Sequence, residues 1–528
     1  MPFQPQIARA ALVAFIASFC TLVVELVAGR VLAPYVGVSL YTWTSIIGVV
    51  LAGISGGAYA GGWLADRRPT PSTLGWLLLA AGAASILIAP ATELLAGDDG
   101  LLTSMGIAMT LLRRVVLLAF VLFFLPSFFL GMISPVAVKL AVRDLATAGR
   151  VVGKIYAFST LGSIAGTFVT GFYLVAHFGT RKTLVGAGVI LIASGFLFGG
   201  LLGRRGRAVA IAVLVAGAVY AGAWPGALPP PYQDPLMQPT MGTGRVYFEE
   251  SQYYTISVER TVREDNGGAL LALHLDHLLH SYADLDDPSH LEYGYQQLFH
   301  DMITAKIDAH PSPRLLFIGG GGYTLPRLLT KTHRNVNIDV VEIDPAVSRV
   351  ARRWFGVPRT PRLRTINEDA RWFAMRANGP YDVIIIDAFN DLSVPYHLTT
   401  REFTADIRRL LAPNGVVAVN VVDDITRGRF LASYVRTMQS AFGASNVGVM
   451  LEEEDDLRST RSTYVVVASN SLPSTLASMR GYALPQGHLD TLLAERNALI
   501  LTDDYAPVDA MLAPLFADRF VDEVAETD

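Results

Sequence analysis

Cysteine and charged residues are both scarce in this chain of 528 residues. Its single cysteine, Cys20, excludes an intramolecular disulfide and any zinc cluster built from cysteines. Charged residues make up 17% of the sequence and hydrophobic residues 52%, whereas average soluble domains carry roughly 25% charged residues. This balance excludes an intrinsically disordered chain and argues against a wholly soluble globular protein.

The few charges are distributed unevenly along the chain. Basic residues outnumber acidic ones in residues 1–225, and acidic residues outnumber basic ones in residues 226–528. The acidic half argues against nucleic acid as a partner, because phosphate binding needs a basic surface. We therefore expect a polytopic transmembrane domain at 1–225, a Pro- and Gly-rich linker at 226–244, a small β-strand and hairpin region at 245–310, and a Rossmann-like nucleoside-binding catalytic domain at 311–528.

Long apolar runs recur throughout the first domain, and about 20 such residues cross a bilayer as a helix. They predict an α-helical bundle of about seven spans, at 8–29, 42–64, 74–95, 115–134, 155–177, 183–203 and 208–224. The apolar stretch 101–112 is too short alone and could supply part of an eighth span. Glycines crowd the second and fifth spans, where they favour close helix packing. We therefore expect a multi-pass protein whose partner is the lipid bilayer of the cell (inner) membrane.

The second half carries strand signals and then alternates strands with helices. The segments YYTISVER and ALLALHLD flank Asn266-Gly267-Gly268 and predict a β-hairpin. From residue 314 onward, alternating strands and helices predict an α/β doubly wound, parallel sheet. Ligands of such sheets bind at the carboxyl ends of the strands.

Glycines or acids stand at four of these expected strand ends. The run 319–322 consists of four glycines, which permit a tight turn and close approach to a ligand. Glu342 ends the second strand about 20 residues later, where a carboxylate can accept hydrogen bonds from ribose hydroxyls. Glu368 and Asp369 end the third strand, and Asp387 ends the fourth. Each acid alone could simply cap a helix, but together they predict a nucleoside-binding site.

The blocks GGGGYTLPRLL, VVEID, NEDA and YDVIIIDAF together resemble the class I S-adenosylmethionine-dependent fold. More narrowly, they resemble the spermidine synthase family of polyamine aminopropyltransferases. Ser251, Tyr253, Ile256 and Val258 match a strand motif of that family, and a later L-x-T-x-E-F motif begins at Leu398. The apolar half joined to this soluble half is similar to the membrane-fused bacterial members.

The resemblance implies a role for each matching position. It makes Asp387 the catalytic acid next to the attacking amine. It implies that the co-substrate, decarboxylated S-adenosylmethionine, binds to Gly319, Gly320, Gly321, Gly322, Tyr323, Glu342, Glu368 and Asp369. It implies that the acceptor, a small amine such as a diamine or polyamine, binds to Tyr254, Asp276, His280, Asn390 and Asp391. A homodimer and a site without metal are also expected.

Several positions depart from the family pattern. Gly322 stands where the family usually has an aspartate that holds the aminopropyl amine, so intact S-adenosylmethionine remains an alternative donor. Tyr254 and His280 replace family glutamines, and Asn390 replaces a second aspartate, with Asp391 adjacent.

The resulting prediction is an aminopropyltransferase of polyamine synthesis that releases methylthioadenosine. One alternative is methyl or aminocarboxypropyl transfer from S-adenosylmethionine to a membrane-associated acceptor. Another is a polyamine transporter or sensor with a non-catalytic nucleoside-binding domain, because GGWLADRR at 61–68 resembles a loop of major-facilitator transporters. The positive-inside rule favours a C-terminal domain outside the cytoplasm. The donor is made in the cytoplasm, however, so we expect the catalytic domain to face it.

Overall fold

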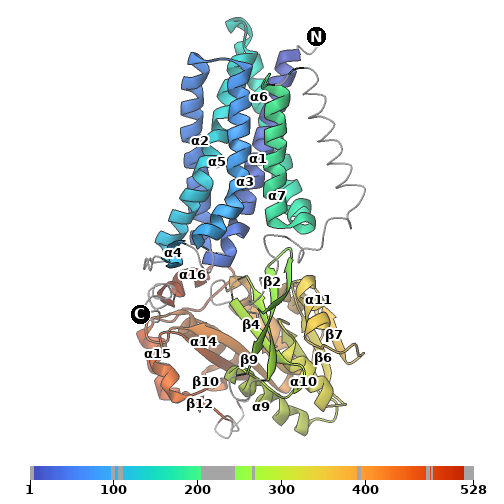
Figure 1. The fold of residues 1–528 in the computed structure, drawn as a ribbon. Helices are drawn as coiled ribbons and strands as arrows, with labels where there is room; N and C mark the ends of the chain where they lie inside the picture. The colour runs from blue at the N-terminus through green and yellow to red at the C-terminus, as the bar shows by residue number, and fades with distance from the viewer. Residues whose placement is uncertain are drawn as a thin grey trace. The chain divides into compact units, whose positions relative to one another are not determined.

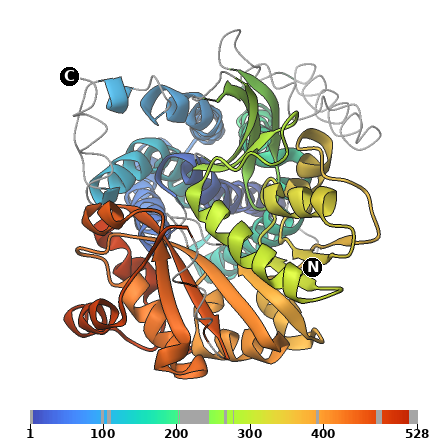
Figure 2. The ribbon, with the colours of Figure 1, turned by 90° about the horizontal axis from the view of Figure 1, so that it is seen from below.

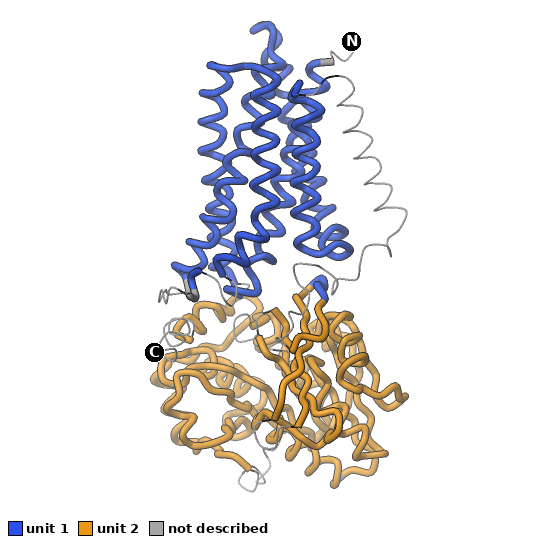
Figure 3. Tube along the Cα trace, viewed as in Figure 1, with its two compact units in different colours: residues 1–238, 249–252, 527–528 blue, residues 239–248, 253–526 orange. Residues whose placement is uncertain are grey.

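The computed structural model divides the chain into two compact units (Figure 3). One unit comprises residues 1–238, 249–252 and 527–528, and the other comprises residues 239–248 and 253–526. The structure describes residues 5–37, 39–96, 101–104, 111–201, 203, 244–263, 268–276, 278–388, 394–470, 472, 476 and 480–515.

The described residues of the first unit up to residue 198 are mostly helical (Figure 1). Its long helices are α1 (Pro5–Val36), α2 (Leu40–Arg67), α3 (Pro71–Ala96), α5 (Leu111–Ala141), α6 (Ala148–Val169) and α7 (Val175–Phe198). Shorter elements are α4 (Leu101–Ser104), the 3-10 turn η1 (Leu145–Thr147) and the π-helical turn η2 (Thr170–Leu174). Buried apolar side chains from α1, α2, α3, α5, α6 and α7 form one core.

Five helical segments in the described part are long and apolar enough to cross a membrane: Gln6–Val36, Leu40–Arg67, Pro71–Ala96, Leu112–Ala141 and Leu145–Phe198. The first four match expected spans. The expected fifth and sixth spans both fall in the last segment, where Gly179 breaks the helix with a φ of 73°. The expected seventh span, 208–224, lies outside the described residues. The stretch 101–112 contributes the one-turn helix α4.

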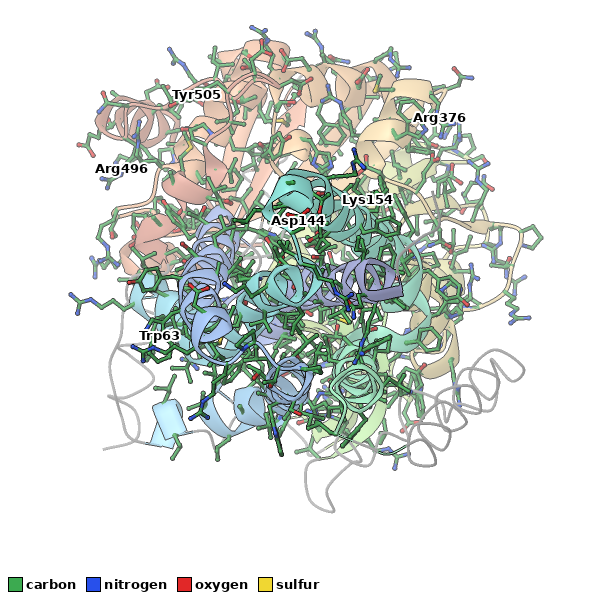
Figure 4. All side chains as sticks on the ribbon, turned by 90° about the horizontal axis from the view of Figure 1, so that it is seen from above. Trp63, Asp144, Lys154, Arg376, Arg496 and Tyr505 are labelled. Atoms are coloured by element: carbon green, nitrogen blue, oxygen red, sulfur yellow. The ribbon has the colours of Figure 1, made fainter. Side chains whose placement is uncertain are left out.

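One end of α2 carries an aromatic ring beside basic side chains. Trp63, which is labelled in Figure 4, is about half exposed. The Arg67 guanidinium lies 3.9 Å from the centroid of its ring. Nearby, the Lys139 ammonium lies 2.7 Å from the Asp66 carboxylate. Tryptophan and basic residues are typical of the membrane–water interface, so this end of the helix fits a position at that boundary.

The glycines of α2 bring it into backbone contact with α5. A Cβ added at Gly57 would lie 2.0 Å from the carbonyl oxygen of Phe128, and one at Gly61 would lie 2.6 Å from that of Met132. Gly162 and Gly166 of α6 approach the backbone of α1 in the same way. These glycines therefore act by packing, because small residues let helix backbones approach in an apolar solvent.

Enlarging a packed glycine should therefore destabilise the bundle. We expect Gly57→Leu to lower the thermal midpoint of the detergent-purified protein, because overpacking a close contact costs about 1–3 kcal/mol or more. Gly62→Leu on the same helix is the matched control, since a Cβ there meets nothing within 4 Å. Equal midpoints for the two variants would contradict the packing role of Gly57.

The second unit begins with a small antiparallel sheet. Its strands pair in the order β1 (Arg245–Glu250), β2 (Thr255–Val262), β3 (Ala269–Leu275) and β4 (Leu278–Asp284). The expected hairpin is confirmed by β2 and β3, in which Val258 pairs with Leu273. Helix α9 (Gly294–Ala309) follows β4 and leads into the large sheet.

The large sheet has eight strands in the order β12-β10-β11-β9-β8-β5-β6-β7. Its strands are β5 (Arg314–Ile318), β6 (Asn337–Val341), β7 (Leu363–Ile366), β8 (Tyr381–Ile386), β9 (Leu411–Asp423), β10 (Val447–Leu451), β11 (Ser462–Ser469) and β12 (Tyr482–Ala483). Its helices are α10 (Thr324–Thr332), α11 (Pro345–Trp354), α12 (Ala370–Arg376), α13 (Arg401–Leu410), α14 (Phe430–Phe442), α15 (Gln486–Glu495) and α16 (Val508–Met511). Short 3-10 turns are η4 (Tyr396–Leu398), η5 (Ala444–Asn446) and η6 (Glu454–Arg458).

The sheet is mixed rather than wholly parallel. Strands β7, β6, β5, β8 and β9 run parallel, whereas β11 pairs antiparallel with β9, and β10 pairs antiparallel with β11. In Figure 2 the small sheet is green, and the strands of the large sheet run from yellow-green to red-orange. The carboxyl ends of the parallel strands therefore meet at one edge of the sheet, which is where the acids and glycines of interest lie.

Candidate active site

A cavity of about 680 Å³ lies at this edge, within the second unit. The residues lining it follow β5, β6, β7 and β8, with further contributions from β4, α9, β9 and β11. Its size lies in the range of small-molecule sites, roughly 300–1,000 Å³. The cavity gathers residues that are separated by more than a hundred positions in the sequence.

The glycine turn after β5 packs against the ends of two neighbouring strands. Gly319 has a φ of 95°, and a Cβ there would lie 2.2 Å from the Asp387 carbonyl oxygen. Its N–H donates to the Val341 carbonyl at 2.9 Å, and the Gly320 N–H donates to Glu342 Oε2 at 2.8 Å. Only glycine fits such a conformation and contact without strain, so the turn leaves backbone rather than side chains facing the cavity.

Glu342 is a buried carboxylate held by the backbone. Its Oε2 accepts from Gly320, and its Oε1 accepts from the N–H of Asp344 at 2.9 Å. Burial raises its pKa, and the backbone hydrogen bonds offset part of that rise. A carboxylate has about four acceptor sites, so Glu342 retains lone pairs for a ligand in the cavity.

Asp369 and Glu368 lie at the same edge, after β7. Asp369 caps α12 by accepting from the Trp372 N–H at 3.1 Å, and its Oδ2 lies 3.0 Å from His397 Nε2. Glu368 pairs with Arg376 of α12. Sequence reasoning missed His397, which lines the cavity from η4.

Asp387 lies beyond the end of β8, between the glycine turn and β9. Its Oδ1 accepts from Asn420 Nδ2 at 2.8 Å, and its Oδ2 accepts from the Tyr295 hydroxyl at 3.3 Å. Burial raises the pKa of Asp387, and these two hydrogen bonds offset part of the rise. A carboxylate of raised pKa in a cavity is a common arrangement for a proton acceptor.

Asn420 was not anticipated, although a polar residue stands out in the apolar strand VVAVNVV. It is 8% exposed and lines the cavity from β9. While its Nδ2 orients Asp387, its buried Oδ1 has no hydrogen-bond partner among the residues that the structure describes. A buried acceptor without a partner is costly, so Asn420 Oδ1 is suited to receive an N–H from a ligand.

The residues expected to bind the acceptor are not all brought to the cavity. Tyr254 and His280 line it, and burial raises the pKa of Tyr254. Asp276 is not among the described lining residues. Its Oδ1 instead accepts from the Thr255 N–H at 3.0 Å and joins β3 to the start of β2. The expected residues Asn390 and Asp391 lie outside the described residues.

Two of the expected donor-binding residues lie behind the turn rather than in the described lining. The Gly322 N–H donates to Ser281 Oγ at 2.9 Å, and a Cβ at this glycine would lie 2.7 Å from Ser281 Cβ. The Tyr323 side chain is 1% exposed, and its hydroxyl lies 3.1 Å from Ser348 Oγ. Gly322 and Tyr323 therefore support the turn from the side that does not line the cavity.

The described residues include no group of three or more His, Cys, Asp or Glu that could hold a metal ion.

The fold and the edge site define a mixed α/β domain with a cavity at the carboxyl ends of its parallel strands, where ligands of such sheets bind. Residues 296–448 match the spermine/spermidine synthase domain. The C-terminal part of the chain is therefore a spermine/spermidine synthase domain, and five long apolar helices precede it.

Parts of the chain are similar to individual proteins. A polyamine aminopropyltransferase of Vibrio vulnificus is 39% identical over 123 residues, which cover 22% of this chain and 41% of that protein. Polyamine aminopropyltransferase 1 of Streptomyces coelicolor is 27% identical over 317 residues, or 56% of each chain. A probable spermidine synthase of Corynebacterium glutamicum, a solved structure, is 23% identical with a TM-score of 0.43 and covers 50% of this chain and 98% of its own. The chain thus spans about half the length of the curated relatives, which are distant homologues.

The hydrogen bonds that the Glu342 carboxylate accepts from the backbone can be tested directly. Glu342→Gln keeps one acceptor oxygen and loses the other, so either Gly320 or Asp344 keeps an unpaired N–H, at a cost of about 1–3 kcal/mol. We expect faster amide hydrogen exchange in residues 319–322 and a lower thermal midpoint. Glu495→Gln, on the exposed face of α15, is the control. Unchanged exchange in the turn would contradict this role.

Proposed function

We propose that the C-terminal domain is an aminopropyltransferase that moves an aminopropyl group from decarboxylated S-adenosylmethionine to an amine and releases methylthioadenosine. The observation that carries this proposal is Asp387, a carboxylate of raised pKa set beside the glycine turn. The family match and the aminopropyltransferase relatives support the same reaction.

The donor fits the part of the cavity that is lined by the ends of the parallel strands β5, β6 and β7. The side-chain-free turn at Gly319 and Gly320 leaves room for the nucleoside to approach the backbone. Glu342 offers acceptor oxygens to the ribose hydroxyls, and Asp369 offers one to the adenine amine. These assignments rest on the order of the strands, because Asp369 follows β7, Glu342 follows β6 and the turn follows β5.

Asp387 then prepares the nucleophile. An alkyl amine has a pKa near 10 and is almost wholly protonated at neutral pH, so it must lose a proton before it can attack. Asp387 accepts that proton, and Asn420 and Tyr295 hold the carboxylate in place. A C–N bond forms at the aminopropyl carbon next to sulfur while the C–S bond breaks. The electron pair of the broken bond stays on sulfur, so methylthioadenosine leaves as a neutral thioether. Positioning the two reactants supplies much of the rate.

Removal of the proton acceptor tests this mechanism. Asp387→Asn should lower kcat by about 10²–10⁴-fold, the usual contribution of a general base, while donor binding persists. Asp490→Asn on the exposed face of α15 is the matched control and should keep full activity.

The pH dependence supplies a second readout. Asp387 must be ionised to accept a proton, so activity should fall as pH drops through its pKa. Because burial raises that pKa, the acid limb should lie above the value near 4 of an exposed aspartate. The limb should vanish in Asp387→Asn, and full activity of that variant would refute the base role.

Donor identity separates the proposal from its alternative. Gly322 offers no carboxylate for an aminopropyl amine, and an N-terminal histidine N-methyltransferase of Emericella nidulans is 37% identical over 147 residues, which favours intact S-adenosylmethionine as the second candidate donor. We expect calorimetry on the purified chain to give tighter binding of the decarboxylated donor. Tighter binding of the intact donor would redirect the search to methylated or aminocarboxypropylated products.

The five apolar helices anchor this activity at a membrane in our proposal. We infer that the protein lies in the cell (inner) membrane with the synthase domain in the cytoplasm, where the donor is made. A C-terminal reporter that is active only outside the cytoplasm would overturn that orientation.

A further inference from the structure

The donor of the proposed function ends in an aminopropyl tail whose ammonium needs a hydrogen-bond acceptor near the glycine turn. In the cavity this turn follows β5, between Glu342 beyond β6 and Asp387 beyond β8. A donor whose ribose meets Glu342 and whose reacting carbon faces Asp387 therefore has its sulfur, and the root of its tail, beside the turn. Gly322 offers no side chain there, so an acceptor for the tail amine must come from another element.

Strand β4 supplies a polar side chain at this point. Ser281 lines the cavity, although it is only 5% exposed. Its Oγ accepts from the Gly322 N–H at 2.9 Å, and a Cβ added at Gly321 would lie 3.0 Å from the same atom. Ser281 therefore contacts both the glycine turn and the cavity.

Ser281 occupies the space that a side chain at position 322 would need. A Cβ added at Gly322 would lie 2.7 Å from Ser281 Cβ and 3.2 Å from Ser281 Oγ. The two positions therefore cannot both carry a side chain unless one of them shifts. The glycine at 322 and the serine at 281 are complementary, and the polar atom beside the turn comes from β4 rather than from the turn itself.

Two further hydrogen bonds hold β4 on the helix that follows the turn. Thr324 Oγ1 donates to the Tyr282 carbonyl at 3.1 Å, and Arg327 Nη2 donates to the Asp284 carbonyl at 2.8 Å. Arg327 is fully buried. Ser281 is thus fixed in place before a ligand binds, which lowers the entropic cost of a contact with it.

The Ser281 hydroxyl keeps hydrogen-bonding capacity for a ligand. A serine oxygen has two acceptor lone pairs, and the Gly322 N–H uses one of them. Among the residues that the structure describes, the hydroxyl forms no other hydrogen bond. The carboxylates of Glu342 and Asp387 flank the turn, so the surroundings also favour a cationic tail. We propose that Ser281 Oγ accepts a hydrogen bond from the tail amine of the donor, an inference that rests on the proposed function.

Binding of three nucleosides to the full-length, detergent-purified protein tests this contact without turnover. Decarboxylated and intact S-adenosylmethionine both carry the tail amine, whereas methylthioadenosine lacks the tail. We expect Ser281→Ala to raise the Kd of the decarboxylated donor, relative to that of methylthioadenosine, by about tenfold or more, as for loss of a hydrogen bond to a charged group. Ser257→Ala is the matched control, because Ser257 is a buried serine of the same small sheet that is not in the described lining. It should leave the ratio of the two Kd values unchanged.

A second pair of variants moves the hydroxyl from β4 to the turn. Gly322→Ser alone should lower the thermal midpoint, because its Cβ meets the side chain of Ser281. In the double variant Ser281→Gly/Gly322→Ser, the new side chain enters the space that Ser281 has left. We expect the preference for the decarboxylated donor over methylthioadenosine to recover toward that of the unaltered protein.

Two results would overturn the inference. If Ser281→Ala weakens the binding of all three nucleosides equally, Ser281 only supports the turn, and if no Kd changes, Ser281 does not contact the donor. If the intact donor binds more tightly, or if no amine releases methylthioadenosine from the decarboxylated donor, the proposed function fails instead. The comparison of a donor that carries the tail with methylthioadenosine still decides in that case whether Ser281 holds the tail amine.

Discussion

The site depends on the close approach of the glycine turn after β5 to the strands on either side. Gly319 is wedged against the Asp387 carbonyl, and its N–H is bound by Val341 of β6. Glu342 fixes the next residue, Gly320, through its carboxylate. Three parallel strand ends are thereby held in one register. Displacement of the turn would move both the expected ribose acceptor and the expected proton acceptor.

Glu342 and Asp387, two buried carboxylates of this site, differ in the hydrogen bonds that offset the cost of burying them. Desolvation raises the pKa of both, because burial disfavours the charged form. Glu342 accepts from two backbone N–H groups, which cannot turn away, so it behaves as a fixed acceptor. Asp387 receives hydrogen bonds from the side chains of Asn420 and Tyr295, and the Tyr295 contact is long at 3.3 Å. The more weakly held carboxylate is the better suited to take up and release a proton.

The features that could be predicted from the sequence are those that depend on local sequence patterns. The glycine run, Glu342 and Asp387 could be placed because each directly follows an apolar strand, and parallel strand ends converge. Asn420 was missed because its approach to Asp387 depends on the pairing of β9 with β8. The mixed character of the sheet was missed for the same reason.

Other differences between the expected and the observed structure have local causes that the pattern of apolar residues does not reveal. The expected fifth and sixth spans fall in one helical segment because Gly179 turns the chain without an intervening loop. Asp276 was expected in the acceptor pocket. Its backbone adopts a φ of 56° in the turn after β3, and one of its carboxylate oxygens accepts a hydrogen bond from the Thr255 N–H. The turn geometry thus directs this oxygen to the backbone. In the glycine turn, the side of the chain facing the cavity changes between Gly321 and Gly322, which sequence spacing alone does not reveal.

The two ends of the cavity have separate structural origins. The end at which the donor is proposed to bind is built from parallel strands whose carboxyl ends must meet, so its acids and glycines are constrained together. The opposite end is completed by the start of α9 and by β11, an antiparallel strand added beyond β9. A substitution at the start of β11 changes this opposite end without moving the glycine turn. In the proposed function, the acceptor site can therefore change while the donor site and the position of Asp387 are preserved.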